Sequence, residues 1–299
     1  MIKLGIIGAS EGNGHPYSWS AIFNGYQPEI MENCGYPVIP QYLEKQQWPE
    51  ARIAGAQVSS VWTQDRELSK HIAAASCIPC VCETLEAMLA QVDAVLLARD
   101  DAETHWRHAA PFLKAGKPIY IDKPIALSSD DLQALYALEQ YPGQIFTCSA
   151  LRYSTELTLA DTDRHGVGEI REIVAFTPKS WDKYSAHIIE PVLRLLPEGD
   201  MPKTISRCPF PKNTGKPGSL SVRWNSGITS RLFAFGDAVS NISIRVHGTK
   251  GWKELVFTDS FSAFKAALHD FVEGIRTKSV RSPRRFNELV VHLIEEGRK

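Results

Sequence analysis

The sequence predicts an α/β fold: an N-terminal domain built on a doubly wound parallel sheet, followed by an α+β domain with a largely antiparallel sheet. Up to about residue 150, apolar runs alternate with amphipathic helical segments. Beyond that point, strand-like segments follow one another with little but turns between them. The chain has 299 residues, which is long enough for two domains with separate cores. We therefore expect domains at residues 1–150 and 151–299.

Alternation of strands and helices in the first half indicates a parallel sheet covered on both faces. The predicted strands cover residues 2–10, 56–63, 78–82, 92–98, 117–124 and 144–153. The predicted helices cover residues 18–25, 65–76, 84–91, 102–116 and 128–140. Residues 26–56 contain Pro28, Pro37, Pro40 and Pro49 and show no sustained period. We expect this segment to be an insertion with short helical pieces.

Several strand-like segments of the second half alternate in polarity, which is typical of an antiparallel sheet with one face covered. They cover residues 168–178, 218–226, 227–236, 241–248 and 251–257. Two predicted helices close the chain, at residues 260–277 and 282–299.

The charge balance and the cysteines exclude several classes of protein. Lys plus Arg is 33 and Asp plus Glu is 34, so no overall basic field favours nucleic acid or an anionic membrane. No apolar run reaches the length of a membrane span, and we identify no signal peptide. The six cysteines are Cys34, Cys77, Cys80, Cys82, Cys148 and Cys208. They lack a second ligand pair at zinc spacing, so we expect no metal and thiols in a reducing cytoplasm.

A glycine-rich turn follows the first strand, at the start of a helix. Glycines there let the backbone approach a pyrophosphate, and the helix N-terminus supplies amide donors. The predicted cofactor-binding residues of this turn are Gly8, Ser10, Gly12, Asn13 and Gly14. His15 lies beside the turn, where it either faces the cofactor or caps the helix.

The second strand ends near Thr63, where a dinucleotide site usually has an acid for the ribose hydroxyls. Asp65 and Arg66 follow. A missing carboxylate and a nearby Arg favour the 2′-phosphate of NADP, so Thr63 and Arg66 are predicted cofactor ligands. The alternative is that Asp65 and Arg66 simply begin a solvated helix.

The strand over residues 117–124 ends in Asp122-Lys123-Pro124, where the proline fixes the backbone beside one ammonium group. A glycine-rich turn, a strand ending in "DKP" and a second domain opening with "GEIREI" together resemble the Gfo/Idh/MocA family of oxidoreductases. The resemblance implies a Rossmann domain that binds NAD or NADP. It also implies a C-terminal sheet that shapes the substrate site and often forms a dimer interface.

The resemblance also implies roles for individual residues. The family's Glu-Lys-Pro corresponds here to Asp122-Lys123-Pro124, so Lys123 would contact cofactor and substrate and hold the reacting oxygen. Asp122 would orient that Lys and lie at the substrate. The Lys-Pro peptide bond of the family is often cis, and we expect the same here.

The family's Asp-x-x-x-His signature is altered. The best match is "WDKYSAHIIEPV", in which His187 and Glu190 fit but Lys183 occupies the Asp position. His187 or the Tyr184 phenol would act as acid or base, and Lys183 would contact substrate. A His on an amphipathic helix is also often structural.

Three further residues are expected near the ligands. Arg99, in "ARDD", would bind a phosphate or an anionic substrate, or would pair with Asp100. Arg152 and Tyr153 resemble the family's entry to the second domain and are predicted substrate contacts, or else part of a structural ion pair.

The predicted function is an NAD(P)-dependent oxidoreductase acting on a CH–OH or carbonyl carbon of a sugar, inositol or related polyol. A small-molecule substrate and a homodimer or higher homo-oligomer formed through the C-terminal sheet are expected. The alternative is a cofactor-binding sensor or scaffold of the same fold without turnover. The altered Asp-x-x-x-His motif favours the second function, and the retained Lys123 and His187 favour the first.

Overall fold

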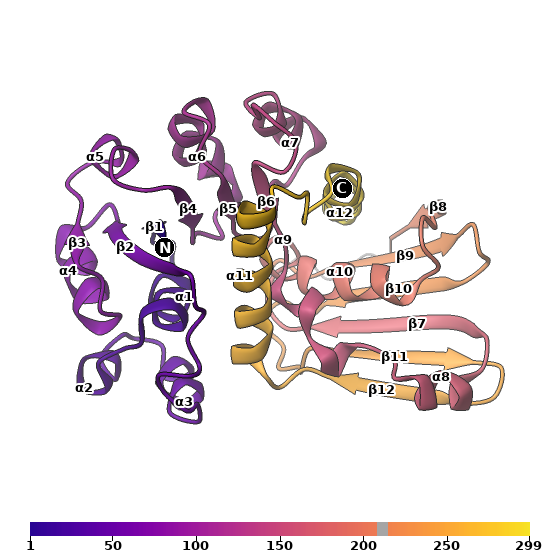
Figure 1. Cartoon of the computed structure of the whole chain (residues 1–299). Coiled ribbons are helices and arrows are strands. Elements are labelled where there is room, and N and C mark those ends of the chain that lie inside the picture. The colour runs from indigo at the N-terminus through magenta and orange to yellow at the C-terminus, as the bar shows by residue number, and fades with distance from the viewer. Residues whose placement is uncertain (208–214) are drawn as a thin grey trace. The chain divides into compact units, whose positions relative to one another are not determined.

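A computed structural model of the chain describes residues 1–207 and 215–299 (Figure 1). It contains two compact units. The first unit comprises Met1–Ala126, Asp130–Thr147 and Phe264–Arg284, and the second comprises Leu127–Ser129, Cys148–Ala263 and Arg285–Lys299. Residues 264–284 therefore pack with the first unit although they follow the second in sequence. The domain boundary between residues 150 and 151 stays a prediction.

A six-stranded parallel sheet forms the centre of the first unit, with the strand order β3-β2-β1-β4-β5-β6. The strands are β1 (Ile2–Ile7), β2 (Ala56–Trp62), β3 (Cys80–Val81), β4 (Ala94–Leu97), β5 (Ile119–Ile121) and β6 (Ile145–Thr147). This is the order of doubly wound dinucleotide-binding folds, so the predicted N-terminal fold is confirmed. Strands β4, β5 and β6 and the last four residues of β1 are buried on both faces, as their apolar composition predicts, whereas β2 and the edge strand β3 are partly exposed.

Helices cover both faces of this sheet: α1 and α4 pack together on one face, and α5 and α6 lie on the other (Figure 1). The helices are α1 (His15–Asn24), α2 (Pro28–Met31), α3 (Val38–Leu43), α4 (Arg66–Ala75), α5 (Leu85–Leu89), α6 (His105–Lys114) and α7 (Ser129–Tyr136). A short 3-10 helix, Ala102–Thr104, precedes α6. Residues 26–56 contain α2 and α3, so the predicted short helical pieces are present, and the assignment of this segment as an insertion stays a prediction.

The C-terminal part of α11 (Ser260–Thr277) completes the aromatic core of the first unit. The Phe271 ring lies 5.7 Å from Tyr120 on β5 and 5.6 Å from Phe146 on β6. Tyr120 also stacks on Trp19 of α1 at 4.7 Å. Burial of these rings is the main driving force for recruiting a helix so distant in sequence.

The second unit contains a six-stranded sheet with the order β12-β11-β7-β10-β9-β8. The strands are β7 (Ile170–Thr177), β8 (Pro202–Ser206), β9 (Gly218–Trp224), β10 (Thr229–Ala234), β11 (Ser243–Gly248) and β12 (Trp252–Val256). All neighbours are antiparallel except β7 and β10, so the predicted largely antiparallel sheet is confirmed.

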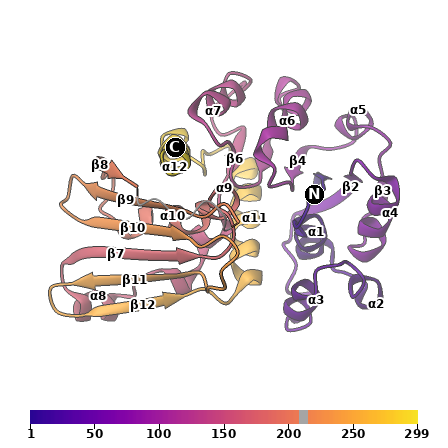
Figure 2. The ribbon, with the colours of Figure 1, turned by 180° about the vertical axis from the view of Figure 1, so that it is seen from behind.

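Helices α8 (Asp161–Val167) and α10 (Ala186–Leu195) lie against this second sheet. Figure 2 shows its opposite face, which none of the described helices of this unit covers. Two more helices belong to the unit, α9 (Trp181–Tyr184) and most of α12 (Arg284–Arg298). The Trp181 indole donates a hydrogen bond to the Ile294 carbonyl and so ties α9 to α12.

Three secondary-structure expectations were wrong or incomplete. The predicted strand over residues 144–153 ends at Thr147, and Ala150–Tyr153 form a 3-10 helix in which Ser149 accepts the Leu151 amide. Helix α8 and strand β8 were not predicted, because both are short and largely polar. Cys208 lies outside the described residues. Among the described helices, none is long and apolar enough to span a bilayer.

Candidate active site

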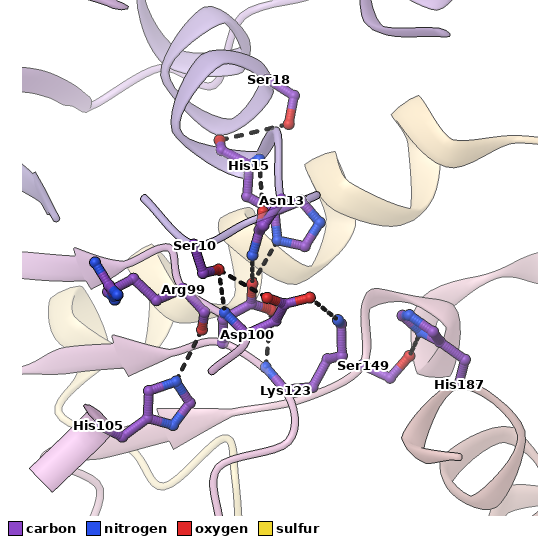
Figure 3. A network of polar contacts seen from close by, with 11 residues as sticks. Ser10, Asn13, His15, Ser18, Arg99, Asp100, His105, Lys123, Ser149 and His187 are labelled. Carbon is purple, nitrogen blue, oxygen red and sulfur yellow. Dashed lines mark hydrogen bonds and ion pairs between the residues drawn. The ribbon is translucent and has the colours of Figure 1, made fainter. Parts of the chain in front are cut away.

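Polar residues meet where β1, β4 and β5 end, because parallel strands place their carboxyl ends at one edge of the sheet (Figure 3). The turn of residues 8–14 follows β1, Asp100 follows β4, and Asp122 and Lys123 follow β5. The sequence predicted each of these segments as part of the site, and the first unit brings them together.

The three glycines of the turn have different surroundings. Gly12 has φ 77°, and a Cβ placed there would meet no atom within 4 Å. A Cβ on Gly8 would lie 2.5 Å from Pro16 Cγ, so this glycine allows β1 and α1 to pack closely. A Cβ on Gly14 would lie 2.6 Å from Ile39 and 2.9 Å from Tyr36. The insertion therefore fills the space beside Gly14, and backbone open to an approaching phosphate is found at Gly12.

Lys123 is held in place by the end of β4. Its Nζ lies 3.8 Å from Asp100 Oδ2, and its side chain is only 6% exposed. Asp100 is in turn tied to the glycine-rich turn: Ser10 Oγ donates to Asp100 Oδ1 at 2.7 Å and accepts the Asp100 amide at 3.0 Å. The Lys123–Pro124 peptide bond is cis, as expected. One cation is thus held beside the turn.

Asp122 is fully enclosed and accepts three hydrogen bonds. Asn13 Nδ2 donates to Oδ2 at 2.9 Å, His15 Nδ1 lies 2.5 Å from the same oxygen, and the Lys123 amide donates to Oδ1 at 2.8 Å. Burial alone would raise the pKa of this carboxyl, but the charges of His15 and Lys123 and the hydrogen bonds lower the pKa to about 2. Asp122 is therefore ionised at neutral pH.

Arg99 is engaged within the protein. Its guanidinium forms two hydrogen bonds with Asp101, at 2.9 and 2.6 Å, and Nη1 donates to Gln64 Oε1 at 3.0 Å. Burial opposes ionisation of Asp101, but this guanidinium holds the pKa of the carboxyl below its usual range. The ion pair anticipated with Asp100 thus forms with Asp101, and a ligand-binding role for Arg99 stays a prediction.

Gln64 connects Arg99 to the glycine-rich turn. The Ala9 amide donates to Gln64 Oε1 at 3.0 Å, and Gln64 Nε2 donates to the Ala9 carbonyl at 2.9 Å. Sequence reasoning missed this residue, because a glutamine at a strand end carries no distinctive motif.

The end of β2 begins a helix. Asp65 caps α4 by accepting the amides of Glu67 and Leu68. The buried Thr63 hydroxyl donates to the Asp65 carbonyl at 2.5 Å. Arg66 is 64% exposed and pairs with Glu83 at 2.6 Å. Asp65 and Arg66 thus form the start of a solvated helix, and cofactor contacts by Thr63 and Arg66 stay predictions.

In the second unit, His187 on α10 is buried, and its Nδ1 lies 2.8 Å from Ser149 Oγ (Figure 3). The Tyr184 ring packs edge-on at 4.9 Å from the imidazole, and its hydroxyl accepts a hydrogen bond from Lys179 at 2.6 Å. Lys183 stands on α9. The α9–α10 segment therefore places His187 and Tyr184 together, as the motif predicts, but their catalytic roles stay predictions.

Arg152 and Glu190 form a loose buried pair, with Arg152 Nε 3.5 Å from Glu190 Oε2. The Ser149 amide donates to Glu190 Oε1 at 2.6 Å, and Oε2 has no hydrogen bond. Burial raises the pKa of Glu190 to about 7, although the Arg152 charge and the Ser149 amide oppose this. The Arg152 guanidinium also lies 5.3 Å from the Tyr153 ring. This geometry supports the structural ion pair, and substrate contacts by Arg152 and Tyr153 stay predictions.

Two histidines of the first unit form polar contacts that the sequence did not predict. His15 bonds Asp122, whereas the sequence left its partner open. His105 is fully buried, with its two ring nitrogens 3.0 and 2.8 Å from the carbonyl oxygens of Ile125 and Arg99. Neither partner could be read from sequence spacing. Among the described residues, no cluster of three or more metal-ligating side chains occurs.

Comparison with protein-family models matches residues 31–149 to the oxidoreductase family with an NAD-binding Rossmann fold, Gfo/Idh/MocA. The matched segment contains Arg99, Asp122 and Lys123 but begins after the glycine-rich turn. A comparison with curated proteins gives no match.

Solved structures resemble the whole chain. UDP-N-acetylglucosamine 3-dehydrogenase from Acidithiobacillus ferrooxidans is 17% identical, with a TM-score of 0.71, and the match covers 99% of this chain and 96% of that one. Myo-inositol 2-dehydrogenase from Lactobacillus plantarum is 14% identical, with a TM-score of 0.73 and coverages of 98% and 95%. Myo-inositol dehydrogenase from Lactobacillus casei, in complex with NAD(H) and myo-inositol, is 14% identical, with a TM-score of 0.72 and coverages of 99% and 93%. At these identities the likeness shows a shared fold.

Proposed function

We propose that this protein is an NAD(P)-dependent oxidoreductase, because residues 31–149 match the model of the Gfo/Idh/MocA oxidoreductase family. It transfers a hydride to or from a hydroxyl or carbonyl carbon of a sugar, inositol or related polyol. The observation that carries the proposal is Lys123, a nearly buried cation held at the end of β5 by Asp100, beside a glycine-rich turn. The known activities of similarly folded dehydrogenases on inositol and a nucleotide sugar support the substrate class.

The first unit offers a place for the dinucleotide that fits its chemistry. The open backbone at Gly12 and the N-terminus of α1 suit a pyrophosphate, with Gly8, Ser10, Asn13 and Gly14 shaping the turn. The bound nicotinamide supplies the hydride acceptor or donor. Lys123 holds the substrate oxygen and stabilises the negative charge that develops on it. The Asp100 carboxylate balances the Lys123 charge in the absence of substrate.

Cofactor choice leans to NADP in this proposal. Arg66 sits on the solvent side of the β2 end, and its exposed ion pair with Glu83 contributes little to stability. The guanidinium can therefore exchange Glu83 for a 2′-phosphate at low cost. The residue after Thr63 is Gln64, so no carboxylate stands directly there to bind ribose hydroxyls or to repel a 2′-phosphate.

Residues of the second unit complete the proposal. His187 and Tyr184 remain candidates for proton transfer, and Lys183, Arg152 and Tyr153 for contact with substrate hydroxyls. Each of the five side chains can donate a hydrogen bond, and His187 and Tyr184 can also accept one.

We also propose a homodimer formed through the open face of the second sheet. Phe176, Phe233 and Phe235 stack there with ring separations of 5.8 to 6.2 Å and are only half-buried in the single chain. A second copy would cover this aromatic strip. A cytoplasmic location fits the five described cysteines, which are all free thiols.

A cofactor-binding sensor without turnover is the second candidate, and a specific observation favours it. Lys183 stands on α9 at the Asp position of the family motif, and His187 Nδ1 meets the neutral hydroxyl of Ser149. Both features weaken the case for proton transfer, whereas the glycine-rich turn is retained. Such a protein would bind the cofactor, yet transfer no hydride.

The two candidates separate in one experiment. The purified protein is mixed with NAD or NADP and a panel of sugars, inositols and nucleotide sugars, and absorbance of the reduced nicotinamide is followed. Calorimetry with each cofactor runs in parallel. Turnover supports the oxidoreductase, binding without turnover on any member supports the sensor, and no binding of either cofactor at millimolar concentration contradicts both.

A further inference from the structure

We propose that His15 is the group that exchanges a proton with the substrate hydroxyl, oriented for this task by Asp122. The inference rests on the proposed function and assigns a role that the family motif would place on His187. His15 lies at the first position of α1, directly after the glycine-rich turn.

The contact between His15 and Asp122 sets the position of the ring proton. His15 Nδ1 lies 2.5 Å from Asp122 Oδ2, and Asn13 Nδ2 holds the same oxygen from a second side at 2.9 Å. An ionised carboxylate only accepts hydrogen bonds, so Nδ1 must carry the proton. In the neutral imidazole the lone pair then lies on Nε2, which is the arrangement of a general base with an orienting carboxylate.

The ring is also fixed in its plane and remains reachable. It stacks on Trp19 at 4.8 Å with an interplanar angle of 13°, and the Phe264 ring meets it edge-on at 4.9 Å. The side chain is 16% exposed. Among the described residues none bonds Nε2, and this atom is not one of the buried polar atoms that lack a partner. Nε2 is therefore open to solvent or a ligand.

Asp122 also links His15 to the predicted oxygen-binding cation. Its second oxygen, Oδ1, accepts the backbone amide of Lys123 at 2.8 Å. The charged groups around the imidazole are thus Asp122 and, through it, Lys123, since Trp19 and Phe264 carry no charge. The Asp122 carboxylate therefore contacts both the His15 imidazole and the backbone of Lys123, the residue proposed to bind the substrate oxygen.

The proposed step balances as follows. In the oxidation direction the carbinol C–H bond breaks, and its hydrogen and electron pair pass to the nicotinamide. The O–H proton passes to His15 Nε2, and the C=O bond forms. The imidazolium that results is stabilised by Asp122 and later releases the proton to water. Reduction runs the same transfers in reverse.

His187 is the comparison. Its Nδ1 meets the neutral hydroxyl of Ser149 at 2.8 Å rather than a carboxylate. Glu190 is the carboxylate closest to His187 in sequence. It accepts a hydrogen bond from the Ser149 amide and pairs with Arg152. At Nδ1, the neutral Ser149 hydroxyl would stabilise an imidazolium less than the ionised Asp122 carboxylate does at His15.

The first test reads the tautomer without requiring activity. Nitrogen-15 NMR of ¹⁵N-histidine-labelled protein is recorded across pH, with the His15 signals identified by their loss in His15→Gln. Wild type is expected to show the Nδ1–H tautomer at His15, and Asp122→Asn is expected to increase the Nε2–H form. A proton on Nε2 in the wild type overturns the proposal. The exposed His292 on α12 serves as the control signal, unchanged by Asp122→Asn.

The second test measures the kinetics of the reaction with a substrate that the panel identifies. His15→Gln is expected to lower kcat by roughly 10²–10⁴-fold, with KM and the cofactor Kd changed by less than about threefold. The acid limb of the pH–rate profile is expected to disappear. His292→Gln is the matched control and should keep wild-type rates. Thermal melting verifies that both variants are folded.

Each outcome has a distinct meaning. A His15→Gln enzyme that keeps its acid limb, while His187→Gln loses it, overturns the assignment but leaves the proposed function intact. A wild type that turns over no member of the panel overturns the proposed function, and the role of His15 with it, whatever the tautomer.

Discussion

Two fully buried carboxyls, Asp122 in the first unit and Glu190 in the second, have pKa values pushed in opposite directions. The pKa of Asp122 is lowered to about 2 and that of Glu190 is raised to about 7. Burial acts on both in the same sense, because it disfavours the charged form. The difference lies in their partners.

Asp122 accepts hydrogen bonds on both oxygens, from Asn13, His15 and the Lys123 amide. Glu190 accepts one, from the Ser149 amide, while its second oxygen is 3.5 Å from Arg152 and otherwise unbonded. Donor count and distance therefore decide the charge of a buried carboxyl. At Asp122 the donors therefore outweigh burial and keep the carboxylate charged, whereas at Glu190 burial outweighs the few donors.

The comparison predicts that changes near Asp122 affect the rate most strongly. Lys123→Ala removes the cation that would hold the reacting oxygen and should lower kcat by on the order of 10²–10³. Cofactor affinity should stay close to wild type, whereas stability should fall, because the buried Asp100 and Asp122 carboxylates lose a nearby cation. Lys123→Arg should rescue poorly, since the planar guanidinium is larger and holds its charge at all pH values. Near wild-type turnover by Lys123→Ala would show that Asp-Lys-Pro merely ends a strand here.

Changes near Glu190 should instead alter the dependence of stability on pH. Because the folded pKa lies above 4.5, the ordinary value for a Glu side chain, the native state binds the proton more tightly, and stability falls as pH rises from about 4.5 to about 7. This loss amounts to on the order of 3 kcal/mol. Glu190→Gln keeps an acceptor for the Ser149 amide and should flatten the curve. Urea unfolding at several pH values measures it, and an unchanged slope in the variant contradicts the assignment.

Asp122 should show the opposite pH dependence. Its folded pKa lies below 3.8, the ordinary value for an Asp side chain, so its ionised form stabilises the protein above about pH 4, and this contribution is lost as pH falls towards 2. The contribution is on the order of 2 kcal/mol. Asp122→Asn should reduce stability at neutral pH and remove this acid-induced loss. Acid titrations followed by circular dichroism test the sign, and a variant that is as stable as wild type at pH 7 refutes it.

The smallest effect is expected outside both regions, at the exposed pair of Arg66 and Glu83. Arg66→Gln should weaken NADP binding by about fivefold, near 1 kcal/mol, and leave NAD binding and stability unchanged. Glu83→Gln is the matched control, because it frees Arg66 and should not weaken NADP. Calorimetry with both cofactors measures the two affinities. Equal losses for NAD and NADP in Arg66→Gln would place the residue away from the 2′ position.

Much of the fold could be predicted from sequence because its signals are local. Apolar runs alternating with helices identified the first sheet, and the alternating strands after residue 168 identified the second. Errors fell where local signals were weak. The polar edge strand β8 and the short α8 lack apolar periodicity, and the segment after β6 turns into a 3-10 helix capped by Ser149.

By itself, the sequence identified the polar motifs at the strand ends, because Gly8–Gly14 and Asp122–Lys123 are motifs within contiguous residues. The tertiary structure alone decided their partners. Asn13 and His15 lie more than 100 positions from Asp122, and Tyr36 reaches Gly14 from an insertion without periodicity. Most of helix α11 packs in the first unit, although this helix follows all strands of the second sheet in the sequence. Such contacts depend on which surfaces the folded sheet brings together, so they cannot be predicted from the spacing of residues along the chain.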